Sequence, residues 1–253
     1  MKILSPNRIM TLLLLMGCAT TPAPRPQAYV PRFDFTPPSS SPPGSSGITF
    51  ALVSPHYSEQ NPWTRLYPFD QFATNLNQDY QEALIARGFS LKGPYENYDL
   101  MTFPDKEDSD LVLIPLVDVR VDISNSQLAS ERSLLGIITP GFKISGNAVV
   151  RSQLNLVARE PLTMENMWTK NLSVSNTSVP FTTQKRYNVE SSAQLSYLTL
   201  DVLLEDPGFV QALAPELERA YGDLMRQTWA HLDPAEMQLV AKQAQELKAR
   251  KRY

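Results

Sequence analysis

The side chains that most often carry catalysis or bind metals are scarce in this chain, which has one cysteine and two histidines. His56 and His231 lie far apart in the sequence, and neither has the neighbours expected of a zinc ligand. The sequence contains no G-x-S-x-G, no S-x-x-K and no phosphate-binding glycine loop. Pairing carboxylates for acid–base work requires a geometry that sequence does not give. We therefore expect no enzyme, no metal and no cofactor.

The thiol of Cys18 is the one reactive group whose setting indicates a modification. It follows a basic start and the apolar segment Ile9–Met16, which is far too short to span a bilayer and is typical of an export signal. The run Leu15-Met16-Gly17-Cys18 resembles the bacterial lipobox, in which the cysteine receives lipid (palmitate among its acyl chains) and begins the mature protein. We predict a signal peptide over 1–17 and lipidated Cys18. The alternative is an ordinary secretory signal, cut elsewhere, that leaves a free thiol.

The residues that follow, 18–47, are rich in proline and serine and carry little apolar surface. Such composition predicts a disordered tether that holds a domain away from a membrane. Tyr29–Phe35 interrupts this tether with three aromatic residues, which either dock on the folded domain or on a partner, or form a locally adhesive piece of linker. Ala19 stands where enteric-type bacteria use aspartate to mark inner-membrane retention, so we expect the outer membrane.

The remaining chain, 48–253, predicts one globular α/β domain of the α+β type. We expect a single mixed, largely antiparallel sheet packed by one N-terminal helix and a long C-terminal helical segment. Ile48–Ser54 is a continuous apolar run typical of a buried strand. A helix capped by Asp70 and ended by Gly88 should follow, with its apolar stripe against the core.

Longer strands are predicted in the middle of the chain. Leu111–Ile123 begins apolar and then alternates, and Ile144–Arg159 alternates and forms a hairpin with the pattern that continues through Trp168–Val174. Leu134–Phe142 is apolar but broken by glycine and proline, so it is either a buried connection or an exposed adhesive loop. The acidic run Asp105–Asp110 lacks the calcium-loop spacing and predicts a solvated turn.

The C-terminal part predicts a strand and two helices. Tyr197–Leu204 has strand character, and Asp206-Pro207 starts a helix. Asp233 should cap a second helix, with the Glu236 side chain reaching back to it. That helix ends in basic residues, which suit its C-terminal dipole or, alternatively, an anionic lipid or acidic glycan surface. The net charge of -3 argues against nucleic acid as a partner.

Three stretches carry a resemblance to a known family: Gly88-Phe89, Ile138–Phe142 and Leu239–Arg252. With them the chain, from its first strand to its end, resembles the neuraminyllactose-binding haemagglutinin family, the Helicobacter adhesin A type of lipoprotein. The resemblance implies an outer-membrane or flagellar-sheath lipoprotein that acts as an adhesin for sialylated glycans. The family's basic glycan motif is missing, because Ser124–Arg132 has a single basic residue here. No binding residue is therefore transferred.

Two functions remain open at this stage. The first is a surface adhesin or interaction lipoprotein, which the flagellar sheath could also hold. Its partner would be a glycan or an envelope protein. The second is a structural periplasmic lipoprotein of an envelope or flagellar assembly. The candidate ligand contacts are aromatic residues in loop-like sequence: Trp63, Tyr67, Tyr95 and Tyr98. Protein surfaces that bind are enriched in such side chains, although core or rim positions are the alternative.

Overall fold

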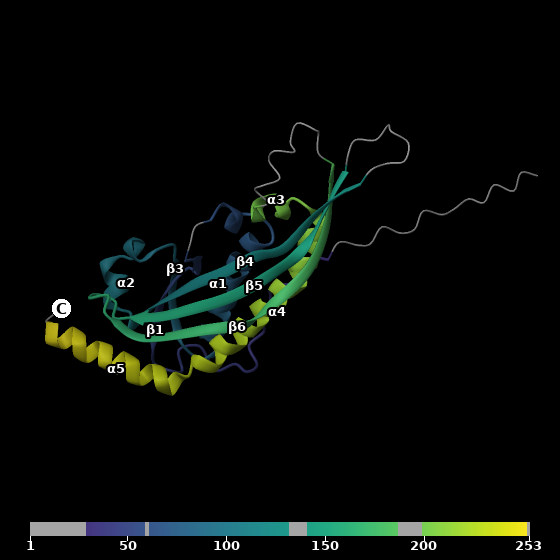
Figure 1. The fold of residues 1–253 in the computed structure, drawn as a ribbon. Helices are drawn as coiled ribbons and strands as arrows, with labels where there is room; N and C mark the ends of the chain where they lie inside the picture. Colours follow the sequence, from purple (N-terminus) through teal and green to yellow (C-terminus); the bar gives the residue numbers. More distant parts are fainter. Residues whose placement is uncertain (1–28, 59–60, 132–140, 187–198, 252–253) are drawn as a thin grey trace, which may run out of the picture.

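The computed structural model describes residues 29–58, 61–131, 141–186 and 199–251 (Figure 1). The predicted signal peptide, the lipidated Cys18 and most of the apolar segment 134–142 lie outside the described residues. No described helix has both the length and the apolar character needed to cross a bilayer.

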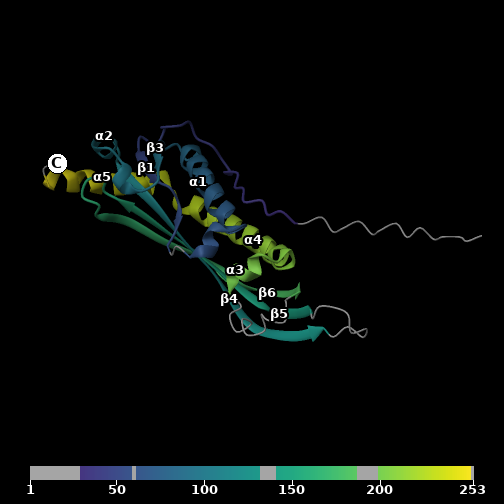
Figure 2. The same cartoon turned by 90° about the horizontal axis from the view of Figure 1, so that it is seen from above.

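The architecture is a long twisted sheet whose one face is covered by helices (Figures 1 and 2). The strands are β1 (Thr49–Val53), β2 (His56–Tyr57), β3 (Ser90–Tyr95), β4 (Leu111–Glu131), β5 (Gly141–Arg159) and β6 (Asn166–Arg186). The α-helices are α1 (Phe69–Ala86), α2 (Phe103–Glu107), α3 (Leu200–Leu204), α4 (Pro207–His231) and α5 (Pro234–Lys251), with 3-10 turns η1 (Pro62–Arg65) and η2 (Tyr98–Leu100). The expected α+β class is confirmed.

The sheet is mixed, with strand order β3-β1-β4-β5-β6 and β2 beside β4. β1 runs parallel to β3 and β4, whereas β4, β5 and β6 pair antiparallel over most of their length. The predicted hairpin is confirmed as β5 and β6. These long strands continue beyond the start of α4, where the backbone of Gly208 lies near that of Thr182.

Helices α1 and α4 supply the core that covers the sheet. The stripe expected on the first helix is confirmed, since Phe72, Leu76 and Tyr80 are fully buried. Gly88 follows the helix with a φ of +84°, as its predicted terminating role requires. The predicted cap was wrong: the helix begins at Phe69, and the Asp70 carboxylate accepts a hydrogen bond from the adjacent Gln71 N–H, outside any cap.

Three further local predictions were wrong for local reasons. The acidic run begins inside helix α2, because Thr102 and Asp105 form a reciprocal capping box that starts a helical turn. Leu200–Leu204 is helix α3 where a strand was expected. Asp233 does accept bonds from the first N–H groups of α5, but Glu236 accepts a hydrogen bond from the Trp168 indole at 2.8 Å and does not reach back.

The segment 29–47, hereafter the strap, belongs to the folded domain and corrects the predicted extent of the tether. Phe33 and Phe35 are 3% and 7% exposed and are part of the main core. The Phe33 ring contacts Phe72 of α1 and Tyr221 of α4, with centroids 5.3 and 5.4 Å apart. Of the alternatives for the aromatic interruption, docking on the domain is therefore the one observed.

Candidate functional site

Among the residues that the structure describes, no three His, Cys, Asp or Glu side chains are grouped to hold a metal ion. His56 lies exposed on β2, with Nδ1 3.1 Å from the Ser54 carbonyl oxygen, and His231 ends α4. The two histidines thus belong to different elements.

The four predicted ligand contacts divide between two places. Trp63 of η1 packs edge-on against Phe69, with centroids 4.7 Å apart, and against Tyr57 at 6.2 Å. It is a partly buried rim residue of the main core. Tyr67, just before α1, is 36% exposed. This pair therefore offers one accessible aromatic ring.

Tyr95 and Tyr98 belong to a second, smaller core formed by Ala51, Val53, Met101 and Val112. The Tyr98 hydroxyl donates a hydrogen bond to the Pro161 carbonyl oxygen at 2.8 Å, and Lys106 Nζ lies 3.8 Å from its ring centroid. These contacts tie η2 and α2 to the turn between β5 and β6. The structure does not unite the four residues in a single site.

An exposed apolar surface beside Tyr98 was missed by the sequence reasoning. Leu100 and Phe103 are 57% and 63% exposed, although both are large hydrophobic residues. Tyr98, Leu100 and Phe103 are hereafter the α2 patch. No pattern in the sequence separates Phe103 from the buried phenylalanines, because exposure depends on which parts of the fold cover the ring; Phe103 is the first residue of α2, directly after the N-cap Thr102.

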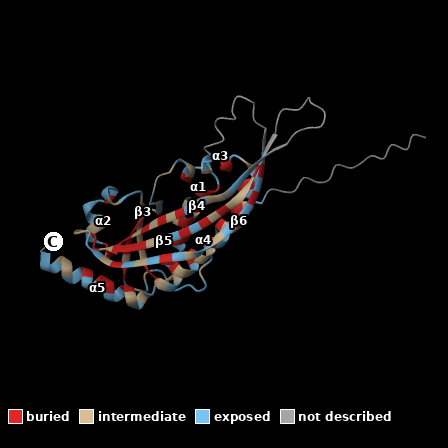
Figure 3. Cartoon of the chain, viewed as in Figure 1, coloured by how far each residue is buried: buried red, intermediate tan, exposed pale blue. Residues whose placement is uncertain are grey.

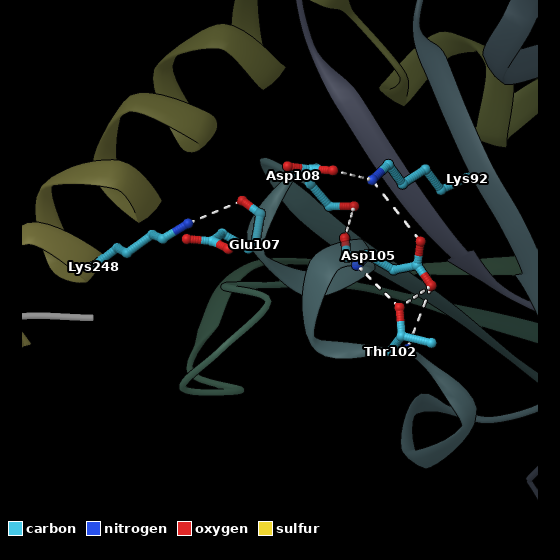
Figure 4. Close-up of polar contacts among 7 residues, drawn as sticks. Lys92, Thr102, Asp105, Glu107, Asp108 and Lys248 are labelled. Atoms are coloured by element: carbon cyan, nitrogen blue, oxygen red, sulfur yellow. Dashed lines mark hydrogen bonds and ion pairs between the residues drawn. The ribbon is translucent and has the colours of Figure 1, made fainter.

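Charged groups brace the backbone around this patch (Figure 4). Lys92 Nζ of β3 lies 3.0 Å from Asp108 and 3.9 Å from Asp105. The Thr102 hydroxyl donates to the Asp105 carboxylate at 2.7 Å, and that hydrogen bond is the main cause that lowers the pKa of Asp105 below its ordinary value. From α5, Lys248 Nζ donates to the Glu107 carbonyl oxygen at 3.0 Å.

A cleft of about 160 Å³ opens between this region and α5. Its lining residues include four carboxylates and one amine: Glu107, Asp108, Asp110, Glu160 and Lys248. Glu160 is 1% exposed and accepts a hydrogen bond from the Leu162 N–H, whereas its Oε1 has no hydrogen-bond partner within the described part of the chain. The excess of negative charge disfavours anions, including sialylated glycans, in this cleft.

A second polar feature holds the strap between α1 and α4, in the region hereafter called the strap groove. Asp79 of α1 is 3% exposed and accepts a hydrogen bond from the Tyr221 hydroxyl at 2.5 Å and another from the Phe35 N–H. Burial is the main cause that raises its pKa to about 6. The Asn75 amide adds a hydrogen bond to the Phe33 carbonyl oxygen at 2.8 Å. This cluster stabilises the fold, because Asp79 bonds both the strap and Tyr221 of α4, and Asn75 bonds the strap.

The fold of this chain is found in a solved structure of another protein. No family model matches the sequence, and no curated protein matches it. Among solved structures, the chain is similar to a neuraminyllactose-binding haemagglutinin homologue of Helicobacter pylori, with 16% identity over 85% of this chain and 98% of that chain. The TM-score of 0.57 shows a shared fold, and the low identity limits the likeness to the fold.

Weaker similarities extend to PelC of Paraburkholderia phytofirmans and to a minor lipoprotein of Acinetobacter baumannii. The PelC structure shares 10% identity over 79% of this chain and 94% of its own, with a TM-score of 0.30. The Acinetobacter lipoprotein shares 12% identity over 74% and 92%, also with a TM-score of 0.30. These two overlaps are too slight to support a conclusion.

Proposed function

We propose that this chain is a lipid-anchored bacterial envelope protein of the outer membrane that acts by binding, as a surface adhesin or interaction protein, and not by catalysis. The observation that carries the proposal is the placement of the single cysteine, Cys18, after a basic and apolar leader. A fold shared with a haemagglutinin homologue supports the adhesin kind of function and a glycan as partner. Membership of that family is part of the proposal.

The α2 patch is the contact surface that we assign to the partner. Its three apolar side chains stand on a backbone that is fixed by the capping box, by Lys92 and by Lys248, so a partner would meet a preformed surface. Rigid presentation lowers the entropy cost of association. Of the four predicted contacts, Tyr98 belongs to this patch, and Tyr67 stays a separate exposed candidate.

A structural role in the periplasm, in an envelope or flagellar assembly, is the second candidate. It is favoured by the same apolar patch, which suits a protein partner, and by the acidic cleft beside it, which disfavours a sialylated ligand. In this case the domain faces inward and its partner is another envelope protein.

Protease treatment of intact cells distinguishes the two candidates. An adhesin exposes its domain, so protease removes it while a periplasmic marker protein survives. An inward-facing domain is spared until the outer membrane is permeabilised. Membrane fractionation of the Cys18→Ser variant completes the test, since this variant should leave the membrane fraction. If it stays in the membrane to the same extent as the unaltered protein, the proposed anchor is wrong.

The contact surface is tested with a double variant, Leu100→Asp with Phe103→Asp. Both side chains are more than half exposed, so the variant should fold and lose partner or cell binding. The matched control is Leu239→Asp on α5, which is 65% exposed and lies outside the patch. Equal binding by both variants would overturn the assignment of the patch.

A further inference from the structure

The acidic cleft between α2 and α5 lies directly beside the α2 patch. Phe103 begins α2, and Glu107, which lines the cleft, ends it. At the rise of an α-helix these two residues lie about 6 Å apart along the axis. On the sheet side, the Tyr98 hydroxyl of the patch donates to the Pro161 carbonyl oxygen, and the neighbouring residue Glu160 lines the cleft. A partner that covers the patch therefore also reaches the cleft.

The charges that line the acidic cleft do not balance. Four carboxylates stand against one amine, which leaves a formal excess of three negative charges. Lys92 lies outside the lining and offsets one of the four, because its Nζ is 3.0 Å from Asp108. Within the described part of the chain, no ion pair involves the other three carboxylates, which belong to Glu107, Asp110 and Glu160. A cation is therefore the complementary occupant.

The basic residues at the end of α5 leave this excess in place. Lys248 is the lining amine, and its Nζ donates to the Glu107 carbonyl oxygen at 3.0 Å (Figure 4). Lys251 pairs with Glu165, which precedes β6. Arg250 is exposed and stands two positions from Lys248, and residues two apart on a helix do not share a face.

Glu160 is the strongest sign that the cleft takes a ligand. Its side chain is 1% exposed, and Oε2 accepts hydrogen bonds from the N–H groups of Leu162 and Thr163. Oε1 has no hydrogen-bond partner among the described residues. Buried charged groups are normally paired, because they have given up their hydration. Since Glu160 borders the cleft, a cation held there would compensate this carboxylate.

The space suits an organic cation. Among the described residues, no three ligating side chains are grouped to hold a metal ion. The volume of about 160 Å³ is close to that of a cavity that holds benzene, so a guanidinium or ammonium group with part of its alkyl stem fits. Arginine and lysine side chains combine such a head with an apolar stem.

We propose that the acidic cleft binds an arginine or lysine side chain of a partner protein, next to the apolar residue with which that partner covers the α2 patch. The partner is then a protein segment in which a basic residue stands beside an apolar one. This inference rests on the proposed function, which assigns the α2 patch to the partner, and it names the chemistry of that partner. The apolar contact supplies buried area, and the cation fixes the orientation of the segment and its selectivity.

Short capped peptides test the cleft directly. The probes are acetyl-Leu-Arg-amide, its uncharged analogue acetyl-Leu-citrulline-amide, and acetyl-Gly-Arg-amide, which lacks the apolar neighbour. Each is added to isotopically labelled mature protein, recovered from membranes in detergent micelles, and nuclear magnetic resonance spectra are recorded. Two reporters are the N–H signals of Leu162 and Thr163, which bond to Glu160. The third is the side-chain amide of Gln245, which bonds to Asp110.

The leucine-arginine peptide should shift these signals and the citrulline peptide should not. The glycine-arginine peptide should bind about tenfold more weakly, because it buries no leucine on the patch. Equal binding of the arginine and citrulline peptides, or no shift with either, overturns the inference. Equal binding of the leucine and glycine peptides shows a site for an isolated cation, such as a free polyamine, and overturns the assignment to a protein partner. The proposed contact surface fails separately, if the double variant Leu100→Asp with Phe103→Asp keeps partner or cell binding.

Removal of single charges tests the carboxylates. Glu160→Gln keeps an oxygen for its two N–H donors and removes the charge, so it should weaken the leucine-arginine peptide by about tenfold or more. Should this variant not fold, Glu107→Gln at an exposed position of the lining gives the same test. The matched control is Glu246→Gln, an exposed α5 residue outside the lining, which should bind like the unaltered protein. Equal weakening by the control would show an effect of net charge and contradict the site.

Lys248→Met tests whether the chain fills its own cleft. This change removes the lining amine and raises the excess of negative charge, so the leucine-arginine peptide should bind more tightly. If the unaltered protein does not respond to the peptide and Lys248→Met does, then Lys248 is the occupant of the cleft and the inference is overturned.

Discussion

The strap groove and the α2 patch both contain phenylalanine, and the molecule uses the two in opposite ways. Phe33 of the strap is 3% exposed and contacts aromatic rings from two helices, whereas Phe103 of the patch is 63% exposed. Figure 3 shows α2, the helix that Phe103 begins, coloured as exposed and intermediate. The first phenylalanine lies in a proline- and serine-rich segment that predicts disorder, and the second begins a short helix. Local composition therefore did not indicate which ring is structural.

The forces that hold the two regions also differ. The strap is held by burial of aromatic rings, which is worth about 2 to 3 kcal/mol for each fully buried side chain. The α2 region is held by a capping box and by partly exposed ion pairs such as Lys92 with Asp108, which are individually worth about 1 kcal/mol or less. Substitutions in the groove should therefore affect stability, and substitutions in the patch should affect binding.

The largest effect is expected from Phe33→Ala. Removing this ring leaves a cavity between α1 and α4, and comparable truncations lower the free energy of unfolding by about 3 to 5 kcal/mol. Urea unfolding of the variant measures the loss. The control is Val30→Ala in the same segment, which is 65% exposed and should change little. A loss below about 1 kcal/mol for Phe33→Ala would show that the strap is not part of the cooperative domain.

The next effect concerns pH and the groove residue Asp79. Its pKa in the folded protein is raised from 3.8 to about 6, chiefly by burial, so the folded state binds this proton more tightly than the unfolded state. The contribution is present below the unfolded pKa, and the free energy of unfolding falls as pH rises from 3.8 to about 6. The fall should be on the order of 2 to 3 kcal/mol.

Urea unfolding at several pH values isolates this contribution by comparison with Asp79→Asn. The variant cannot titrate at this position and should show a flatter dependence between pH 4 and 6, roughly. Asp70→Asn, at an exposed site of the same helix, is the matched control and should keep the dependence of the unaltered protein. An unchanged slope in Asp79→Asn would contradict the assigned role of burial.

A smaller effect is expected from Thr102→Ala at the other region. This change removes the hydroxyl of the capping box, and a lost cap typically lowers the free energy of unfolding by about 1 kcal/mol. Because the cap presents Phe103, partner binding should fall more than stability does. Thermal unfolding and the binding assay are measured on the same variant, with Thr102→Ser as the control that keeps the hydroxyl. A Ser variant as impaired as the Ala variant would argue against the hydroxyl.

The smallest effect on stability is expected from Phe103→Ser. The ring is largely in contact with solvent, so the free energy of unfolding should stay within about 0.5 kcal/mol of its original value. Paired with Phe33→Ala, this variant completes the contrast between the two regions. A loss of several kcal/mol would mean that the patch is covered by part of the molecule.

Periodic and terminating signals in the sequence predicted the centre of the fold. The apolar run of β1, the stripe of α1 and the ending at Gly88 depend on local patterns, and each is found in the structure. The prediction of a strand at 197–204 was wrong over 200–204, because the short apolar run Leu200–Leu204 fits a helical turn as well as a strand. The acidic run Asp105–Asp110 predicted a solvated turn, but Asp105, its first residue, forms a capping box with Thr102 and a helical turn starts there.

The strap and the patch could not be predicted because both depend on tertiary contacts. Phe33 is ordered by Phe72 and Tyr221, which lie far from it in sequence. Trp63 and Tyr95 were selected by residue type, but packing places them at the rims of two different cores. Exposure of Leu100 and Phe103 is likewise decided by what does not cover them, which a sequence does not state.

The central claim is that Cys18 anchors the protein, and the mass of the mature N-terminal peptide tests it most directly. The protein is recovered from membranes and digested, and its N-terminal peptide is analysed by mass spectrometry. We predict a peptide that begins at Cys18 and carries the added mass of a diacylglyceryl group and a further acyl chain. A peptide that begins elsewhere, or an unmodified Cys18 thiol, would contradict the anchor.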